Sequence, residues 1–202
     1  VARQVSPVTT SAGGFASQHS ESAATFSRGR VAAATGESMQ SAPRRREVSL
    51  FCDGSCLGSH GVGAWAYLLI DRETGFRQQN GGTNYDTTNN RMELMAVIEG
   101  LASLFEPSRV HLGVDSQYVS QGMTEWLPAW MARGWRSVGS RSRRVTNIDL
   151  WERLAVQLRR HEVDCHWVRG HNGHPENEFV DVMARTIAAQ AQERRMGGPM
   201  PS

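Results

Sequence analysis

The order of the hydrophobic patterns along the chain constrains its fold more than any other feature of the sequence. Three strand-like runs come first, at 47–53, 63–71 and 75–85, and the short links between them favour an antiparallel meander. Helical and strand-like patterns then alternate, with a helix over 88–105, a strand over 109–115, a helix that Pro128 interrupts, a helix over 148–161, a strand over 161–168 and a helix over 175–190. This succession predicts an α/β domain built on one mixed sheet.

Length and composition predict one folded domain with tails. The chain has 202 residues, of which 39% are hydrophobic, enough for a single sizeable core. Residues 1–46 are rich in Ser, Ala, Thr and Gly, so we expect a disordered N-terminal extension there. We expect the folded domain to span 47–190 and a flexible tail to span 191–202.

The apolar runs and the cysteines bear on the cellular compartment. No apolar run approaches the roughly 18 residues of a membrane span, so we expect no membrane association. Cys52, Cys56 and Cys165 lack CxxC spacing, which suggests reduced thiols inside a cell. These features favour a cytoplasmic protein. The alternative is an organellar protein, because residues 1–46 also have the Arg- and Ser-rich composition of a transit peptide.

Arginine is unevenly distributed, although the net charge is only +2. The stretch 133–147 holds five arginines and no acid, whereas residues 47–202 together hold 16 arginines against 18 acids. A local excess of positive charge predicts contact with a polyanion at that place. An exposed, solvated charge run is the ordinary alternative.

Two of the predicted strands end in an aspartate. Asp53 follows the run LFC, and Asp115 follows LGV. If the first and fourth strands are parallel neighbours, as a helical crossover requires, both carboxylates project at the carboxyl edge of the sheet. Open α/β sheets place their sites at that edge.

One acid on each of two predicted helices can reach the same edge. With the buried stripe of the first helix centred near Leu94 and Leu101, Glu93 lies about 90° away, at the rim of the stripe. Asp181 lies on the flank of the buried stripe of the last helix. Taken singly, each acid is more often a turn former, a cap or a solvated helix residue. Their matching positions favour convergence.

Converging carboxylates require a cation. Two carboxylates about 4 Å apart repel each other by roughly 4 kcal/mol at an effective dielectric constant of 20. Oxygen-only ligation favours hard ions such as Mg²⁺ or Mn²⁺ over zinc. Two such ions about 4 Å apart suit an in-line displacement at phosphorus. The acids therefore predict a divalent-metal site for phosphoryl chemistry.

Five segments of the chain carry a recognisable pattern: FCDGSCLG, TTNNRMELMAVIEGL, VDSQYVSQGMTEW, NIDLWERL and VRGHNGHPENE. Together, and in this order, they resemble ribonuclease H of the bacterial type 1 class across about residues 47–190. The resemblance implies the ribonuclease H fold: an α/β fold whose five-stranded mixed sheet has strand order 3-2-1-4-5, with strand 2 antiparallel, and is flanked by helices. It also implies a monomeric endonuclease that hydrolyses the RNA strand of RNA–DNA hybrids to 3′-hydroxyl and 5′-phosphate ends.

The resemblance assigns roles to acids and to one histidine. Two Mg²⁺ ions, for which Mn²⁺ can substitute, would be held by the four matching carboxylates: Asp53, Glu93, Asp115 and Asp181. These are the residues that the strand and helix patterns select. His171 matches a histidine on a mobile loop of the family that takes part in proton transfer or product departure. We interpret His174 as structural.

The resemblance also supplies contacts to the hybrid. The minor-groove contacts that distinguish RNA by its 2′-hydroxyl match four positions: the backbone at Cys56, and Asn89, Asn90 and Gln117. A DNA-phosphate pocket matches Thr88 and Asn147, and a DNA-strand channel matches Trp126 and Trp130. Helix capping remains an alternative for the asparagines, and core packing for the tryptophans. Further phosphate contacts are expected from Arg141, Arg143 and Arg144.

The chain departs from the family pattern near two of these contacts. Asp86 stands where relatives often have a basic residue supporting the DNA-phosphate pocket, so we expect a weaker pocket. Ser59 and His60 replace a common Asn-Pro pair, which puts one minor-groove contact in doubt.

Two other functions compete with hybrid hydrolysis. A catalytically silent hybrid-binding module would lack a carboxylate, and all four are present. A nuclease of the same fold acting on another polymer, as in reverse transcriptases or transposases, is the second alternative. Cleavage of labelled hybrid, double-stranded RNA and double-stranded DNA distinguishes the three.

Overall fold

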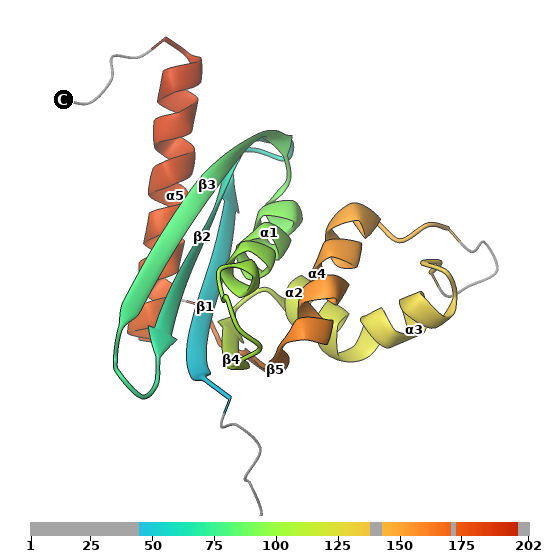
Figure 1. The fold of residues 1–202 in the computed structure, drawn as a ribbon. Helices are drawn as coiled ribbons and strands as arrows, with labels where there is room; N and C mark the ends of the chain where they lie inside the picture. Colours follow the sequence, from blue (N-terminus) through green and yellow to red (C-terminus); the bar gives the residue numbers. More distant parts are fainter. Residues whose placement is uncertain (1–44, 138–142, 171–172, 198–202) are drawn as a thin grey trace, which may run out of the picture. The chain divides into compact units, whose positions relative to one another are not determined.

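Five strands form one sheet in the computed structural model of the chain, which describes residues 45–137, 143–170 and 173–197 (Figure 1). They are β1 (Glu47–Cys56), β2 (Gly61–Asp71), β3 (Arg77–Thr87), β4 (Arg109–Val114) and β5 (Glu162–Trp167). Their order across the sheet is β3-β2-β1-β4-β5. β2 is antiparallel to β1 and β3, and β4 runs parallel to both β1 and β5. The predicted mixed sheet and its strand order are confirmed.

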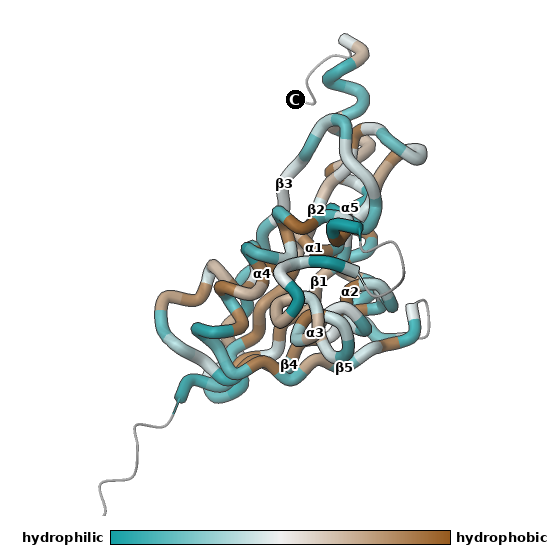
Figure 2. Tube along the Cα trace, turned by 90° about the vertical axis from the view of Figure 1, so that its right-hand side faces the viewer, coloured by the Kyte–Doolittle hydropathy of each residue, from teal (hydrophilic) through white to brown (hydrophobic). Residues whose placement is uncertain are grey.

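The hydrophobic content of the strands follows their place in the sheet. β1 and β2 are central and largely buried, and the sequence of β2, GVGAWAYLLID, is apolar along almost its whole length because both of its faces are covered. β3, with the sequence RQQNGGTNYDT, forms one edge and is mostly exposed. Figure 2 shows the hydrophobic stretches running through the strands in the middle of the domain, whereas β3 is hydrophilic or neutral.

Helices cover both faces of the sheet. They are α1 (Asn89–Ala102), α2 (Gln117–Gln121), α3 (Leu127–Ala132), α4 (Ile148–Arg160) and α5 (Pro175–Arg195), and a π-helical turn, η1 (Gly122–Trp126), joins α2 to α3. α1 and α4 pack on one face, where Leu94 and Trp151 belong to the larger core. α5 packs on the other face, where Val180 contacts a smaller core with Leu68 of β2. Figure 1 shows the sheet lying between α5 and α1.

The helix expected to break at Pro128 instead changes its pitch before that residue. The π-helical turn ends at Trp126, and Pro128 is the second residue of α3. Gly122 opens the π-helical turn, and a Cβ there would lie 2.0 Å from the ring of Trp151. The close packing of this segment on α4 accompanies the irregularity, and the proline does not end the helix.

The two expected boundaries of the domain fall slightly inside the folded structure. α5 continues to Arg195, five residues beyond the boundary placed at 190, because Ala188 and Ala191 are still fully buried. At the other end, Arg46 is part of the fold, since its guanidinium pairs with Asp71 at 2.7 Å. The predicted extension up to residue 44 and the tail from 198 lie outside the described residues. None of the described helices has the length and apolar character needed to span a bilayer.

Candidate active site

Asp53 lies within β1 and is almost completely buried, with 8% of its surface exposed. The strand expected to end at this residue continues to Cys56, so Asp53 is paired with Ala66 of β2 inside the ladder. Its Oδ1 accepts a hydrogen bond of 2.7 Å from the backbone N–H of Gly54. The strand pairing therefore fixes the position of this carboxylate.

Gly54 allows α1 to approach β1 next to Asp53. A Cβ at position 54 would lie 2.2 Å from the backbone nitrogen of Glu93 and 2.3 Å from the carbonyl carbon of Met92. Real Cβ atoms do not come so close to backbone, so only glycine fits between the strand and the helix. Gly54 thus allows Glu93 of α1 to approach Asp53 of β1.

Two side chains hold the carboxylate of Glu93. Asn89, one turn earlier in α1, donates from Nδ2 to Oε1 at 2.8 Å. The hydroxyl of Ser116 donates to Oε2. Ser116 also caps α2 by accepting a hydrogen bond from the backbone N–H of Val119. Since Ser116 follows Asp115, it ties Glu93 to the end of β4.

Asp115 follows the last residue of β4 and is held from α5. Its Oδ2 accepts a hydrogen bond of 3.1 Å from Nδ2 of Asn177, a buried residue in the first turn of α5. Its backbone carbonyl accepts one of 2.8 Å from the indole of Trp167. A Cβ at Gly170 would lie 2.8 Å from Oδ2, so the chain after β5 passes close to this carboxylate.

Asp181 is the fourth acid, and α5 presents it. It is one residue from the buried Val180, and its side chain is only 16% exposed, which agrees with the expected place beside the buried stripe. Arg185, one turn later, donates a hydrogen bond to its Oδ2. This ion pair offsets part of the negative charge of the group.

The electrostatics of Asp53 show that the four acids share one environment. The pKa of Asp53 is raised to about 8, first by burial and then by the negative charges of Asp115, Asp181 and Glu93, while the N–H of Gly54 opposes the shift. The pKa of Glu93 is also raised, first by burial and then by Asp115, against the hydrogen bonds from Ser116 and Asn89. Asp53 therefore lies within electrostatic reach of the three other predicted carboxylates: Glu93, Asp115 and Asp181.

The chemistry of these donors fits hard divalent cations. All four side chains offer carboxylate oxygens, the ligands that Mg²⁺ and Mn²⁺ prefer, and none of the four offers nitrogen or sulfur. The acids are nevertheless not tightly clustered. In residues 45–137, 143–170 and 173–197, the one group of three whose ligand atoms all lie within 4.8 Å of one another is elsewhere, on β4 and β5. Holding an ion among three of the acids requires their ligand atoms to lie closer together than they do in this structure.

A cavity of about 670 Å³ is linked to the acids through Asn89, which lines it and hydrogen-bonds Glu93. Residues from the turn after β1, from the start of α1 and from the start of α4 line it, and they include four of the predicted substrate contacts: Thr88, Asn89, Asn90 and Asn147. Thr88 is the N-cap of α1, and Asn147 is the N-cap of α4 with φ of 59°. Thr88 and Asn89 thus both line the cavity and make local hydrogen bonds: Thr88 caps α1, and Asn89 donates to Glu93.

Charge in this cavity comes from one acid and one arginine. Asp86, in a left-handed conformation with φ of 59°, and Arg91 both line it. The guanidinium of Arg91 contacts Asn147 Oδ1 at 3.3 Å and both carboxylate oxygens of Asp149, at 3.0 and 2.6 Å. Hydrogen bonds to Asp149 raise the pKa of Arg91. Arg91 therefore brings positive charge next to Asn147, while Asp86 brings negative charge to the same cavity.

Trp126 and Trp130 each have a buried and an open side. Their rings lie 5.5 Å apart, and Trp130 makes an edge contact with the buried Trp151 at 5.3 Å. Both also line a cavity of about 290 Å³ together with Arg143 and Arg144. For Trp130 the two interpretations are compatible, since its ring packs on the core and faces a basic cavity, whereas Trp126 packs on Trp130 and Tyr118 and faces the same cavity.

The remaining predicted residues are distributed as follows. Cys56 ends β1, and its thiol donates to the carbonyl of Thr87 at 3.2 Å. Gln117 opens α2 and is exposed, next to Ser116. His171 and Arg141 lie outside the described residues.

Sequence reasoning missed two residues that position the acids, Ser116 and Asn177. Ser116 hydrogen-bonds Glu93, and Asn177 hydrogen-bonds Asp115. The signals were present, since Ser116 directly follows a strand-end aspartate and Asn177 lies within the PENE segment. Neither partner is near in sequence, so the pattern alone did not identify it.

Comparisons with known proteins agree on one family. The family model described as RNase H matches residues 45–189. A ribonuclease H of Xanthomonas campestris pv. campestris is 49% identical over 143 residues, which cover 71% of this chain and 93% of the relative. A ribonuclease H of Stutzerimonas stutzeri is 47% identical over 147 residues, covering 73% and 95%.

Solved structures agree on the fold. A crystal structure described as a type 1 RNase H with the type 2 active-site motif is 32% identical, with a TM-score of 0.65 over 74% of this chain and 75% of that one. The RNase H1 of the archaeon Halobacterium salinarum has the same fold, with a TM-score of 0.54, 23% identity and coverage of 71% and 98%.

A mixed sheet of this order, with helices on both faces and acids gathered at its edge, defines the class of ribonuclease H folds. Within that class, the chain belongs to the RNase H family, whose members are metal-dependent hydrolases.

Proposed function

We propose that this protein is an endonuclease that hydrolyses the RNA strand of RNA–DNA hybrids with two divalent metal ions, leaving 3′-hydroxyl and 5′-phosphate ends. The observation that carries the proposal is the buried carboxylate of Asp53, which shares its environment with three further acids in a chain of the RNase H family. Relatives at 47–50% identity are named ribonuclease H, which supports the same activity here.

Four carboxylates would hold the ions: Asp53, Glu93, Asp115 and Asp181. Mg²⁺ is the proposed ion, with Mn²⁺ as a substitute, because the donors are all carboxylate oxygens. When bound, such ions lower the pKa of water and neutralise charge that develops on a phosphate undergoing in-line displacement.

The protein's own groups prepare the acids for this task. Asn89 and Ser116 restrain both oxygens of Glu93, and Asn177 restrains one oxygen of Asp115. Burial makes the charged form of Asp53 costly unless a cation is nearby, so the site is poised to bind one. These hydrogen bonds limit the orientations from which the acids close around an ion and a phosphate.

Substrate contacts are proposed on the surface around the acids. Minor-groove recognition of the 2′-hydroxyl would come from four positions: the backbone of Cys56, Asn89, Asn90 and Gln117. Thr88 and Asn147 would contact a DNA phosphate, and Trp126 and Trp130 the DNA strand. His171 would assist proton transfer or product departure. The cavities lined by most of these side chains support the assignment.

We further propose that the protein acts as a monomer in the cytoplasm. The organellar alternative rests on the composition of residues 1–46. Imaging of the full chain fused to a fluorescent protein distinguishes the two locations.

A cleavage assay tests the proposed function. With Mg²⁺, the protein should cut an internally labelled RNA–DNA hybrid and leave double-stranded RNA and double-stranded DNA intact. Ligation and phosphatase treatment of the products identify the ends. Binding of the hybrid without cleavage would instead support the silent binding module, and cleavage of either control duplex would support a nuclease of different specificity.

A further inference from the structure

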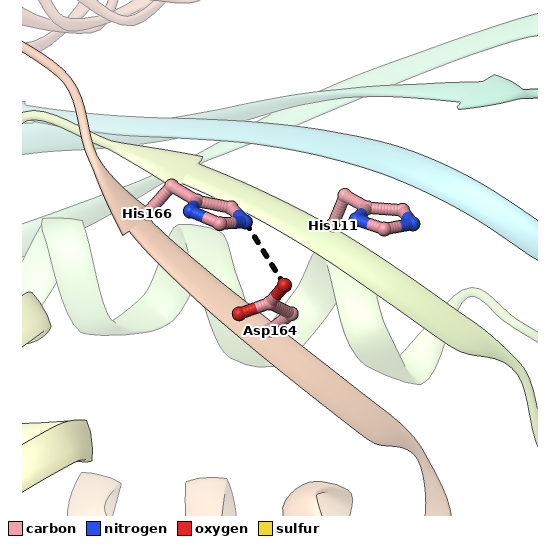
Figure 3. A group of neighbouring side chains, drawn as sticks. All are labelled: His111, Asp164 and His166. Atoms are coloured by element: carbon pink, nitrogen blue, oxygen red, sulfur yellow. Dashed lines mark ion pairs between the residues drawn. The ribbon is translucent and has the colours of Figure 1, made fainter. Parts of the chain in front are cut away.

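A second group of potential metal ligands lies on β4 and the edge strand β5, apart from the four acids. His111 of β4, Asp164 of β5 and His166 of β5 each offer one ligand atom, and these atoms all lie within 4.8 Å of one another. The β4–β5 ladder pairs His111 with Asp164, and His166 follows two residues later on the same face. Figure 3 shows the three side chains next to each other over these two strands.

The separations within this group are close to those of a metal site. Nε2 of His166 lies 3.1 Å from Oδ2 of Asp164. Ligand atoms about 2.1 Å from a tetrahedral zinc ion are about 3.4 Å from each other. The side chains of His166 and Asp164 are 58% and 59% exposed, so both can adjust without disturbing the core.

His111 is oriented by a carboxylate on its other side. Its Nε2 lies 2.6 Å from Oε1 of Glu47 on β1. With Nε2 donating its proton to Glu47, Nδ1 keeps its lone pair for a metal ion. Figure 3 shows one ring nitrogen of His111 on the side of His166 and the other turned away. A carboxylate that holds the far nitrogen of a ligating histidine is the usual outer partner in zinc sites.

We propose that His111, Asp164 and His166 bind a transition-metal ion of the Zn²⁺ class, with Glu47 as the positioning residue of His111. Two imidazole nitrogens and one carboxylate oxygen, with a coordination position left for water, are a donor set that zinc accepts and Mg²⁺ does not favour. The carboxylates of Asp164 and Glu47 balance the charge of a divalent ion. The ion joins β4 to the edge strand β5, and this proposal is independent of the proposed function.

Binding of Co²⁺ and Zn²⁺ to the full chain tests the proposal. The Asp53→Asn background weakens the separate carboxylate site, and Co²⁺ absorption in the visible region reports nitrogen ligands in a tetrahedral site. We expect one equivalent of Co²⁺ with such a spectrum, displaced by Zn²⁺ but not by excess Mg²⁺. His166→Ala in the same background should remove the band and weaken Zn²⁺ binding more than about tenfold, and Glu47→Gln should weaken it about tenfold.

Controls separate the site from other histidines and from a folding defect. His174→Ala removes an exposed histidine outside the group and should leave the Co²⁺ spectrum unchanged. Asp164→Asn, which keeps the shape of the side chain, should repeat the loss seen with His166→Ala. Hydrolysis of the hybrid with Mg²⁺ should stay within about twofold in His166→Ala in an otherwise native chain. The proposal is overturned if Zn²⁺ affinity is the same with and without His166 and Asp164, or if no Co²⁺ band appears.

Discussion

Asp53 is an acid of this site whose ionisation is opposed both by burial and by neighbouring negative charges. Its carboxyl group is buried in a central strand, and three other acids add to the cost of ionising it. A group of this kind is stable in its neutral form or beside a cation. Its properties should therefore depend on pH and on divalent ions in a way that can be measured.

The first prediction concerns stability against pH without metal ions. The pKa of Asp53 is about 8 in the folded chain against 3.8 for an ordinary aspartate, so the folded state holds a proton that the unfolded state has lost. The stabilisation by this proton is complete below about pH 4 and is lost as pH rises through about 8. With a chelator present, the free energy of unfolding should fall between those values, and Mg²⁺ should restore it at high pH.

Asp53→Asn provides the control, because it removes the titrating group. Its free energy of unfolding should vary less between pH 4 and 8. Asp71 has a lowered pKa, through the hydrogen bond from the backbone of Thr74 and then Arg46, so its contribution is lost only at more acidic pH. Denaturant titrations that gave parallel pH curves for the variant and the native chain would contradict the role assigned to Asp53.

The second prediction concerns Asp86. Its carboxylate lines the cavity that holds Thr88 and Asn147, where it would repel a DNA phosphate. Asp86→Asn should raise hybrid affinity by up to about fivefold, the effect of about 1 kcal/mol at an exposed site. Asparagine suits the left-handed backbone at this position, so the fold should be unaffected. Glu106→Gln, which changes an exposed acid outside the cavity, should leave the affinity unchanged in the same fluorescence titration.

The acids of the site could be predicted better than the side chains that hold them in place. Asp53 and Asp115 were recognised because a carboxylate at the end of an apolar strand is a local signal. Ser116 and Asn177 were not recognised, because their partners Glu93 and Asp115 are 23 and 62 residues away. Hydrogen bonds between distant segments follow from the packed fold and leave no periodic trace in the sequence.

At the scale of elements, the contact between β1 and α1 decides whether Asp53 and Glu93 meet. Gly54 is the residue that permits it, since a Cβ there would overlap the backbone of α1. The third prediction is that Gly54→Ala destabilises the domain by at least about 3 kcal/mol, the upper part of the usual range for overpacking. Displacing Glu93 by about 1 Å should also reduce cleavage of the hybrid about 100-fold.

Gly75→Asn is the matched control for that experiment. Gly75 has φ of 72°, no atom lies within 4 Å of the place that a Cβ would take, and asparagine tolerates this backbone. The stability and activity of this variant should both remain near those of the native chain. Normal activity in Gly54→Ala would mean that the approach of α1 to β1 is not needed to position Glu93.

The elements themselves could largely be predicted, and the exceptions have a common cause. Elements with a strong apolar pattern, such as the continuous run of β2 and the helical spacing of α4, lie within a few residues of their predicted positions. The π-helical turn before Pro128 could not be predicted, because it accompanies the contact between Gly122 and Trp151. The extra turn of α5 depends likewise on burial of Ala191 by the rest of the domain.

At the scale of the whole molecule, the folded unit begins earlier than composition suggested. Arg46 pairs with Asp71, and its carbonyl accepts a hydrogen bond of 2.8 Å from the N–H of Arg109. The family match also begins at residue 45. The boundary at 47, drawn where the low-complexity composition ends, therefore removes two residues that belong to the domain.

The fourth prediction tests by truncation whether the domain begins at residue 45 or at residue 47. Deleting residues 1–44 should leave both stability and turnover unchanged. Deleting residues 1–46 should lower the free energy of unfolding, since the N–H of Arg109 loses its acceptor and Asp71 loses the Arg46 guanidinium, although Asp71 keeps its bonds from the N–H groups of Glu73 and Thr74. Denaturant titration and steady-state kinetics of both truncations provide the comparison. Equal stability of the two would show that Arg46 contributes nothing to the fold.

The most direct test of the central claim is cleavage and binding of one labelled RNA–DNA hybrid by the native chain and by Asp53→Asn, side by side in Mg²⁺. The account predicts cleavage by the native chain, and in the variant a loss of at least about 1,000-fold with hybrid affinity within about threefold, because one carboxylate is replaced by an amide of the same shape while the binding surface is kept. Full cleavage by Asp53→Asn would contradict the assignment of the four acids as the metal-binding centre.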